Sequence, residues 1–163
     1  MRVIAGLEKQ DSGHVYFDAE LSDQIPPAER DVAFVFQQYS LYPNMSVYDN
    51  LAFPLRSPLR QTPEAEIKTR IQLAAEKLRI SHLLERKTGK LSGGEMQRVS
   101  IGRAIVREPR VFLMDEPLSN LDAKLRESLR VELKHIQKTQ NSTTVFVTHD
   151  QIEALTMADR IAV

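Results

Sequence analysis

Apolar residues recur along this chain in short runs, and stretches with helical spacing separate these runs. Runs rich in β-branched and aromatic residues at 32–36, 111–114 and 143–148 predict strands. The last two are apolar enough to be buried on both faces, which predicts central strands of a parallel sheet. A shorter alternating run at 14–18, after the turn residues 11–13, predicts one further small strand.

Apolar residues three to four positions apart predict two amphipathic helices. The first begins after Thr62, which we expect to cap it, with Pro63 at the first helical position. Its buried face is expected to hold Ile67, Ile71, Ala74 and Leu78. The second begins after Asp122, and its buried stripe is expected to hold Leu125, Leu129, Leu133 and Ile136. The span 51–90 therefore predicts a helical insertion between strands of the sheet.

The alternation of strands and helices over 163 residues, 42% hydrophobic and 27% charged, predicts one α/β domain with a sizeable core. The 22 basic residues equal the 22 acidic ones, so no overall charge favours nucleic acid or an anionic membrane surface. The absence of cysteine excludes disulfides and thiolate metal sites and fits a reducing compartment such as the cytoplasm. No apolar run approaches the roughly 20 residues that span a bilayer, so a membrane role would require a partner protein.

A helix start that contains two glycines lies at 91–97. Ser92 and Glu95 have the S-x-x-E spacing of a capping box, in which each side chain accepts a hydrogen bond from the other residue's backbone. Gly93 and Gly94 carry no Cβ, so a phosphate has access to the free amides of the first helical turn, where the helix dipole favours an anion. The alternative is an ordinary capped helix preceded by a glycine turn.

Two carboxylates, Asp115 and Glu116, follow the predicted strand at 111–114. They are therefore expected at the carboxyl end of a parallel sheet, where α/β proteins bind ligands. Asp115 is suited to hold Mg²⁺ directly or through water, and Glu116 to act as general base for a water that attacks a γ-phosphate. The alternative is that Asp-Glu-Pro only leads the strand into a turn.

The two segments resemble the signature and Walker B motifs of ABC-type ATPases. Gln37 resembles the glutamine of the Q-loop, residues 119–122 resemble the D-loop, and His149 resembles the switch histidine of the H-loop. All five motifs stand in the order of the family, and the resemblance extends over the whole chain. The segments 36–55 and 91–123 are most similar to ATPase subunits of bacterial sugar and glycerol-phosphate importers.

The resemblance implies an ATPase that uses ATP and Mg²⁺. The residues that it implies in catalysis are Glu116, His149 and Gln37. The residues that it implies in nucleotide binding are Ser92, Gly93, Gly94, Asp115 and Asp122, and those that it implies in metal binding are Gln37 and Asp115. Glu95 departs from the family pattern, in which glutamine is commoner, but glutamate fills the capping role as well.

The fold implied by the resemblance is an α/β fold of the P-loop NTPase type. It consists of a parallel sheet with helices on both faces, a small antiparallel part and an inserted helical subdomain. Residues 1–163 would form a partial ABC ATPase domain, with the helical subdomain at about 51–90 and the signature, Walker B, D-loop and H-loop at 91–163. The phosphate-binding sequence G-x-x-x-x-G-K-[ST] does not occur in the 163 residues, so we expect a domain that is incomplete at both ends.

The missing phosphate loop has an energetic consequence. Charge-assisted hydrogen bonds contribute about 1.5 to 3 kcal/mol each, so three absent contacts would remove roughly 5 to 9 kcal/mol of binding free energy. We therefore expect that the isolated chain neither binds MgATP at micromolar concentrations nor hydrolyses it.

The leading hypothesis is the ATP-hydrolysing subunit of an ABC importer for a carbohydrate or glycerol-phosphate, held on the inner face of the cell membrane by a permease. The implied partners are transmembrane permease subunits, a second ATPase subunit of the same or another kind and, indirectly, a periplasmic or extracellular solute-binding protein. Nucleic acid is not expected. In this family the segment at 46–51 lies against the permease. One alternative is a non-catalytic remnant that donates its signature helix to a partner, and another is a soluble ABC ATPase without a transport role.

Overall fold

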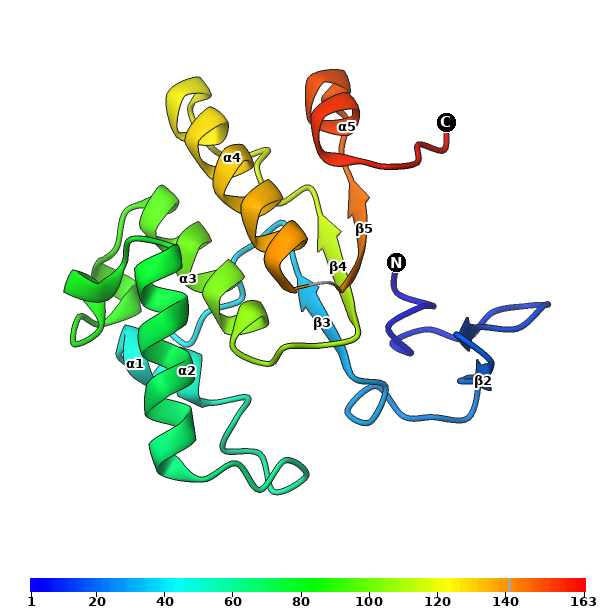
Figure 1. Cartoon of the computed structure of the whole chain (residues 1–163), viewed down its shortest axis with the longest axis horizontal. Coiled ribbons are helices and arrows are strands. Elements are labelled where there is room, and N and C mark those ends of the chain that lie inside the picture. The colour runs from blue at the N-terminus through cyan, green and yellow to red at the C-terminus, as the bar shows by residue number, and fades with distance from the viewer. Residues whose placement is uncertain (141) are drawn as a thin grey trace.

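The computed structural model describes residues 1–140 and 142–163. A parallel sheet lies at their centre, with the strand order β3 (Val32–Val35), β4 (Val111–Asp115) and β5 (Thr143–Val147). β4 pairs in parallel with both neighbours, so the carboxyl ends of the three strands lie at one edge of the sheet (Figure 1). The strands predicted at 32–36, 111–114 and 143–148 are confirmed to within one residue at either end.

Side chains alternate between the two faces of the sheet, as the strand period of two requires. On one face, Phe112 and Met114 pack beneath the helices α3 (Gly93–Ile105), α4 (Ala123–Gln140) and α5 (Gln151–Met157). On the other face, Val111 and Leu113 pack with apolar residues of the N-terminal segment, namely Met1, Ile4, Ala5 and Phe17. Each fully buried side chain of this size stabilises the fold by about 1.5 to 3 kcal/mol. The central strand therefore contributes to stability through both of its faces.

β5 differs from the prediction. We expected burial on both faces, but Thr143 is exposed and Val147 keeps 37% of its surface accessible. Among the described residues β5 pairs only with β4, so it lies at an edge of the sheet. An edge position removes the cover that a second neighbouring strand gives, and apolar composition alone did not show this.

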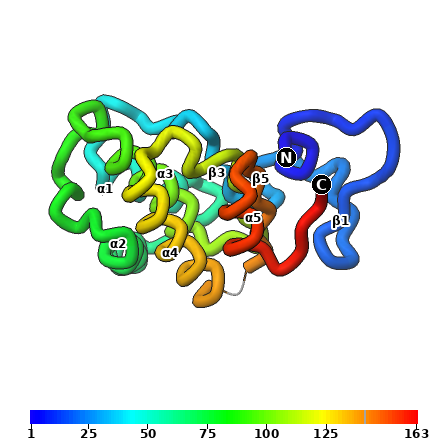
Figure 2. The backbone as a smooth tube through the Cα atoms, turned by 90° about the horizontal axis from the view of Figure 1, so that it is seen from above, coloured from blue at the N-terminus to red at the C-terminus, as the bar shows by residue number. Residues whose placement is uncertain are grey.

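Opposite ends of the molecule carry different architectures. At one end, the short antiparallel strands β1 (Tyr16–Phe17) and β2 (Glu20–Leu21) lie beside the N-terminus, and α1 (Val47–Ala52) and α2 (Glu64–Lys77) lie at the other end (Figure 2). The buried guanidinium of Arg30 fixes the N-terminal turn, because it donates hydrogen bonds to the carbonyl oxygens of Val3 and Ile4 at 3.0 Å each.

The helical end is built around α2 and α3. The predicted face of the first helix is confirmed, since Ile67, Ile71, Ala74 and Leu78 are all at most 2% exposed. The cap is not as predicted: α2 begins at Glu64, Pro63 occupies the cap position, and no side chain caps the helix. Two 3-10 turns, η1 (Ser81–Leu83) and η2 (Thr88–Lys90), then lead into α3.

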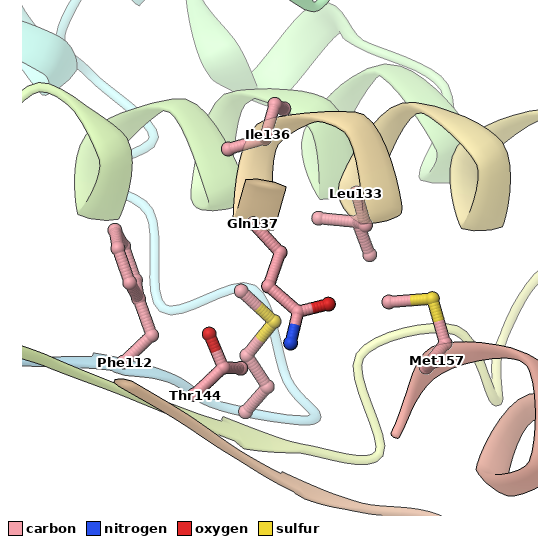
Figure 3. Close-up of a pocket in the computed structure, with 7 residues that line it drawn as sticks. Phe112, Leu133, Ile136, Gln137, Thr144 and Met157 are labelled. Atoms are coloured by element: carbon pink, nitrogen blue, oxygen red, sulfur yellow. The ribbon is translucent and has the colours of Figure 1, made fainter. Parts of the chain in front are cut away.

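The helix α4 covers one face of the sheet. Its predicted stripe is confirmed for Leu129, Leu133 and Ile136, which are buried, whereas Leu125 is only half-buried. A cavity of about 10 Å³ remains between α4, α5 and the sheet (Figure 3). Its lining includes Phe112, Leu133, Ile136, Gln137, Thr144 and Met157. None of the helices in the described part of the chain is both long and apolar enough to cross a membrane.

Candidate functional site

Three predicted site residues come together at the carboxyl edge of the sheet. Gln37 follows β3, Glu116 follows β4 and His149 follows β5, so neighbouring parallel strands deliver all three. The Nε2 atom of Gln37 donates a hydrogen bond to Oε2 of Glu116 at 3.1 Å. The Nε2 atom of His149 lies 2.8 Å from the other carboxylate oxygen, Oε1. Glu116 is therefore the centre of the cluster.

The backbone of Glu116 is held in an unusual conformation. Its φ angle is +46°, in the left-handed region that residues other than glycine rarely adopt. Its N–H donates to the carbonyl oxygen of Val147 at 2.9 Å, and its own carbonyl oxygen accepts from the hydroxyl of Ser119 at 3.0 Å. These contacts fix the direction in which the carboxylate leaves the end of β4.

Asp115, the last residue of β4, presents a different environment. Its half-buried carboxylate makes no hydrogen bond or ion pair with any residue that the structure describes, so its oxygens are open to a ligand. In the orientation that donates to Glu116, the Gln37 amide also leaves its oxygen available. Carboxylate and amide oxygens suit Mg²⁺, which commonly takes one or two protein ligands and completes its shell with phosphate and water oxygens. Within residues 1–140 and 142–163 no group of three or more acidic, histidine or cysteine side chains forms a metal site of its own.

The capping box at the start of α3 is confirmed. The hydroxyl of Ser92 accepts from the backbone N–H of Glu95 at 3.4 Å, and the Glu95 carboxylate accepts from the backbone N–H of Ser92 at 2.8 Å and from its hydroxyl at 2.7 Å. These hydrogen bonds from Ser92 lower the pKa of the Glu95 carboxyl below its ordinary value. The start of α3 is thus rigidly defined.

The two glycines also lie close to neighbouring side chains. A Cβ at Gly94 would lie 2.1 Å from a methyl group of Leu125 on α4, and one at Gly93 would lie 3.2 Å from the hydroxyl of Tyr39. Within the described residues, no hydrogen bond or ion pair joins Ser92, Gly93 or Gly94 to the cluster around Glu116. The structure therefore holds the start of α3 and the carboxylate cluster as two separate features of this chain.

The segment that follows Glu116 joins the loop after β3 and begins α4. The Asn120 side chain donates to the backbone carbonyl of Gln37 at 3.2 Å and so ties the loop after β4 to the loop after β3. Asp122 accepts from the N–H of Leu125 at 3.0 Å and caps α4, which is a structural role for a residue that the sequence assigned to nucleotide binding.

Sequence reasoning missed Arg126 and Glu153, which lie between the loops after β4 and β5. Arg126 is within 4.0 Å of the Glu153 carboxylate. The position of Arg126 in the sequence was a signal for it. A cation near the start of a helix is disfavoured by the helix dipole, which indicates that other contacts stabilise it there.

Comparisons with known proteins show the family of this chain. The family model for "ABC transporter" matches residues 1–119. The trehalose/maltose import ATP-binding protein MalK of Thermococcus litoralis is 56% identical over 169 residues, and the match covers 100% of this chain and 45% of that protein. The sn-glycerol-3-phosphate import ATP-binding protein UgpC of Brucella abortus is 56% identical over 163 residues, covering 100% of this chain and 46% of that protein.

A solved structure is also similar. It is the dimeric post-hydrolysis state of an ATP-binding cassette bound to ADP and Pi, with a TM-score of 0.79 and 29% identity over 96% of this chain and 71% of that one. The parallel sheet, its helices and the small antiparallel pair thus form an α/β fold of the P-loop NTPase type. The chain spans less than half the length of the curated relatives that it matches. On the family match and on these identities, the chain belongs to the ABC transporter family.

Proposed function

We propose that this chain is part of the ATP-hydrolysing subunit of an importer for a carbohydrate or glycerol-phosphate. The observation that carries the proposal is the convergence of Gln37, Glu116 and His149 at the carboxyl ends of three adjacent strands. The names of the relatives, which are import ATP-binding proteins for trehalose/maltose and glycerol-3-phosphate, support the class of solute.

In the proposed reaction, Glu116 accepts the proton of the attacking water. Gln37 and Asp115 would hold Mg²⁺, which, when bound, neutralises charge on the phosphates. Both carboxylate oxygens of Glu116 have partners in the present structure, Gln37 on Oε2 and His149 on Oε1. Each oxygen keeps a further lone pair, so Glu116 can accept a proton while both contacts are in place. The His149 side chain is 87% exposed, and it is the proposed contact for the γ-phosphate.

The start of α3 would serve a second subunit. Its N-terminus offers amides and a positive dipole end to a phosphate. Since no hydrogen bond or ion pair among the described residues joins this helix start to the cluster around Glu116, we propose that Ser92, Gly93 and Gly94 face a nucleotide held by a partner ATPase subunit. The dimeric form of the similar cassette supports such an arrangement.

A groove of about 360 Å³ beside β3 is the proposed contact with the permease. Apolar and aromatic side chains line it together with two half-buried arginines, among them Phe36, Tyr42, Phe53, Arg103 and Arg107. Tyr42 and Phe36 flank the Q-loop, and the helix at Val47–Ala52 follows directly, so a protein bound here would touch the loop that carries Gln37. We propose that a permease bound in this way holds the subunit on the cytoplasmic face of the membrane, where a solute-binding protein acts only indirectly.

The test is Glu116→Gln in the protein produced from its own gene, purified with the subunits that accompany it. We expect ATP hydrolysis to fall by roughly 100-fold or more, because a general base contributes about 10² to 10⁴ in rate, while nucleotide binding is retained. Glu127→Gln on the exposed side of α4 is the matched control and is expected to leave the rate unchanged. Equal rates for Glu116→Gln and the unmodified protein would contradict the assignment.

A second candidate function is a module that only donates its signature helix. The separation of the start of α3 from the carboxylate cluster in the described part of the chain would suit such a role. In that case the protein alone has no turnover, but it restores hydrolysis when mixed with an ATPase subunit that has this loop and lacks a working signature helix. The remaining alternative, an ABC ATPase without a transport role, predicts that no membrane permease co-purifies with the protein.

A further inference from the structure

Arg126, near the start of α4, is the most connected side chain beside the carboxylate cluster. Its guanidinium donates hydrogen bonds to three backbone carbonyls of the loop after β4: Leu118 at 3.2 Å, Ser119 at 3.3 Å and Leu121 at 3.0 Å. This loop begins at Glu116. A planar guanidinium with several fixed donors can hold a loop by its backbone in a way that a lysine cannot.

The same guanidinium faces two carboxylates at the start of α5, the helix that follows β5. Arg126 lies 3.7 Å from Asp150 and 4.0 Å from Glu153. Glu153 is only 2% exposed, and its other oxygen accepts a hydrogen bond from the hydroxyl of Thr148 at 2.6 Å. Thr148 directly precedes His149, and its hydroxyl also accepts from the N–H of Asp150 at 3.0 Å.

Burial of the Glu153 carboxylate costs free energy unless an opposite charge or a hydrogen bond compensates for it. Arg126 provides the opposite charge, and Thr148 provides a hydrogen bond. The result is a continuous connection from the backbone of residues 118–121 through Arg126 and Glu153 to the backbone on either side of His149.

We propose that Arg126 is a positioning residue which, together with Glu153, clamps the loop after β4 to the loop after β5. The clamp keeps Glu116 and His149 at their contact distance of 2.8 Å, although neither Arg126 nor Glu153 touches the Glu116 carboxylate. This inference rests on the proposed ATPase function for its effect on rate, but the clamp itself is a property of the chain without nucleotide.

The test compares Arg126→Met, Arg126→Lys and Glu153→Gln in the protein produced from its own gene with its accompanying subunits. Misplaced catalytic groups can lower a rate by about 100-fold, so for Arg126→Met we expect kcat to fall roughly 10- to 100-fold while KM for ATP stays within about twofold. Arg126→Lys keeps the charge that faces Glu153 and is expected to recover part of kcat. In the Arg126→Met, Glu153→Gln double variant the two effects are expected to be less than additive.

A second measurement does not depend on activity. Amide hydrogen exchange without nucleotide is expected to rise about tenfold in Arg126→Met at residues 118–121 and 148–153, with α2 unchanged. Arg130→Met is the matched control, because Arg130 lies one turn further along α4 and makes no hydrogen bond or ion pair with the described residues. Its rate and exchange should equal those of the unmodified protein.

The outcomes distinguish a failure of the proposed clamp from a failure of the proposed ATPase function. If exchange in both loops stays at the level of the unmodified protein, the clamp does not exist and the inference is overturned. If exchange rises but kcat does not fall, Arg126 stabilises the loops without positioning Glu116, and the inference is again overturned. If the unmodified protein does not hydrolyse ATP, the proposed function fails, and the exchange of the two loops alone decides whether the clamp is present.

Discussion

The residues at the start of α3 cap the helix and also pack closely against their neighbours. Ser92 and Glu95 form the capping box that their spacing predicts, and the glutamate satisfies it with a carboxylate that binds both the N–H and the hydroxyl of Ser92. A Cβ at Gly94 would crowd a methyl group at the end of the Leu125 side chain, so this side chain would have to shift. Capping and close packing are therefore both carried by this short segment, and contact with a nucleotide is the further role proposed for it.

Glu95 gives the first prediction at this scale. Its pKa is lowered by hydrogen bonds from Ser92, so its ionised form stabilises the folded state at neutral pH. Because the folded pKa is below the ordinary value of 4.5, this stabilisation is present above that pH and is lost as the pH falls through the lowered value. We expect Glu95→Gln to remove this part of the acid dependence of the free energy of unfolding, measured by urea titration at several pH values. Glu127→Gln, an exposed change on α4, should leave the dependence as it is.

At the scale of elements, α4 shows where periodicity predicts well and where it fails. The stripe of Leu129, Leu133 and Ile136 faces the sheet, as its spacing indicates. Gln137 lies next to this stripe and extends toward the sheet and α5, between Thr144 and Met157 (Figure 3). Its Oε1 atom is buried without a hydrogen-bond partner among the described residues, so a polar group lies in an apolar gap.

This gap leads to a prediction of increased stability. A buried acceptor without a partner costs about 1 to 3 kcal/mol, and methionine has a similar length and no such group. We therefore expect Gln137→Met to raise the free energy of unfolding by about 1 kcal/mol in urea titration. Lys138→Met, at the exposed neighbouring position, serves as control and should change stability by less than about 0.5 kcal/mol. A loss of stability for Gln137→Met would instead indicate that the 10 Å³ cavity holds a water bound to Gln137.

At the scale of the whole molecule, the helical end must be joined to the part built on the sheet. Besides apolar packing, several polar contacts make this connection, including Arg60 with Asp31. Another is Arg98 of α3, which donates to the carbonyl of Leu78 at 3.1 Å and forms an ion pair with Glu132 of α4. Both side chains are nearly buried, with 13% and 10% of their surfaces exposed, so solvent screens the pair weakly.

Breaking this pair is expected to be costly. Glu132→Leu leaves the Arg98 guanidinium buried beside Arg79 without its carboxylate, which should lower the free energy of unfolding by about 3 kcal/mol. The double change Arg98→Met with Glu132→Leu should cost markedly less, since no charge is then left unpaired. Urea unfolding of the two single variants and the double variant measures the coupling, and simple additivity would show that the pair does not join the two parts.

The order of elements and much of the core followed from the sequence, because periodicity reports local burial directly. The strands that carry Phe112 and Val145 and the buried face of α2 are examples. The edge position of β5 did not follow, since strand order depends on contacts between residues far apart in the chain. The cap at Pro63 was placed one residue early for the usual reason that helix ends are weakly encoded.

The candidate site was predictable in its parts and not in its connections. Gln37, Glu116 and His149 each follow a predicted strand, so their meeting at one sheet edge was open to inference from the parallel arrangement. The contacts of Arg126 were not, because they reach backbone carbonyls, which every residue possesses and which no sequence pattern marks. The roles of the predicted site residues in catalysis and nucleotide binding stay predictions until the variants above are measured.

With Glu116 as the proposed general base, its left-handed backbone implies a conflict between the stability of the fold and the proposed ATP hydrolysis. A non-glycine residue held in this region costs the fold about 1 kcal/mol or more, and a glycine at the same place would release that strain. Selection of variants for heat resistance alone would therefore drive position 116 toward glycine and discard the carboxylate. An engineer who wants a sturdier form of this protein should leave that residue fixed and seek the gain elsewhere, for instance at Gln137.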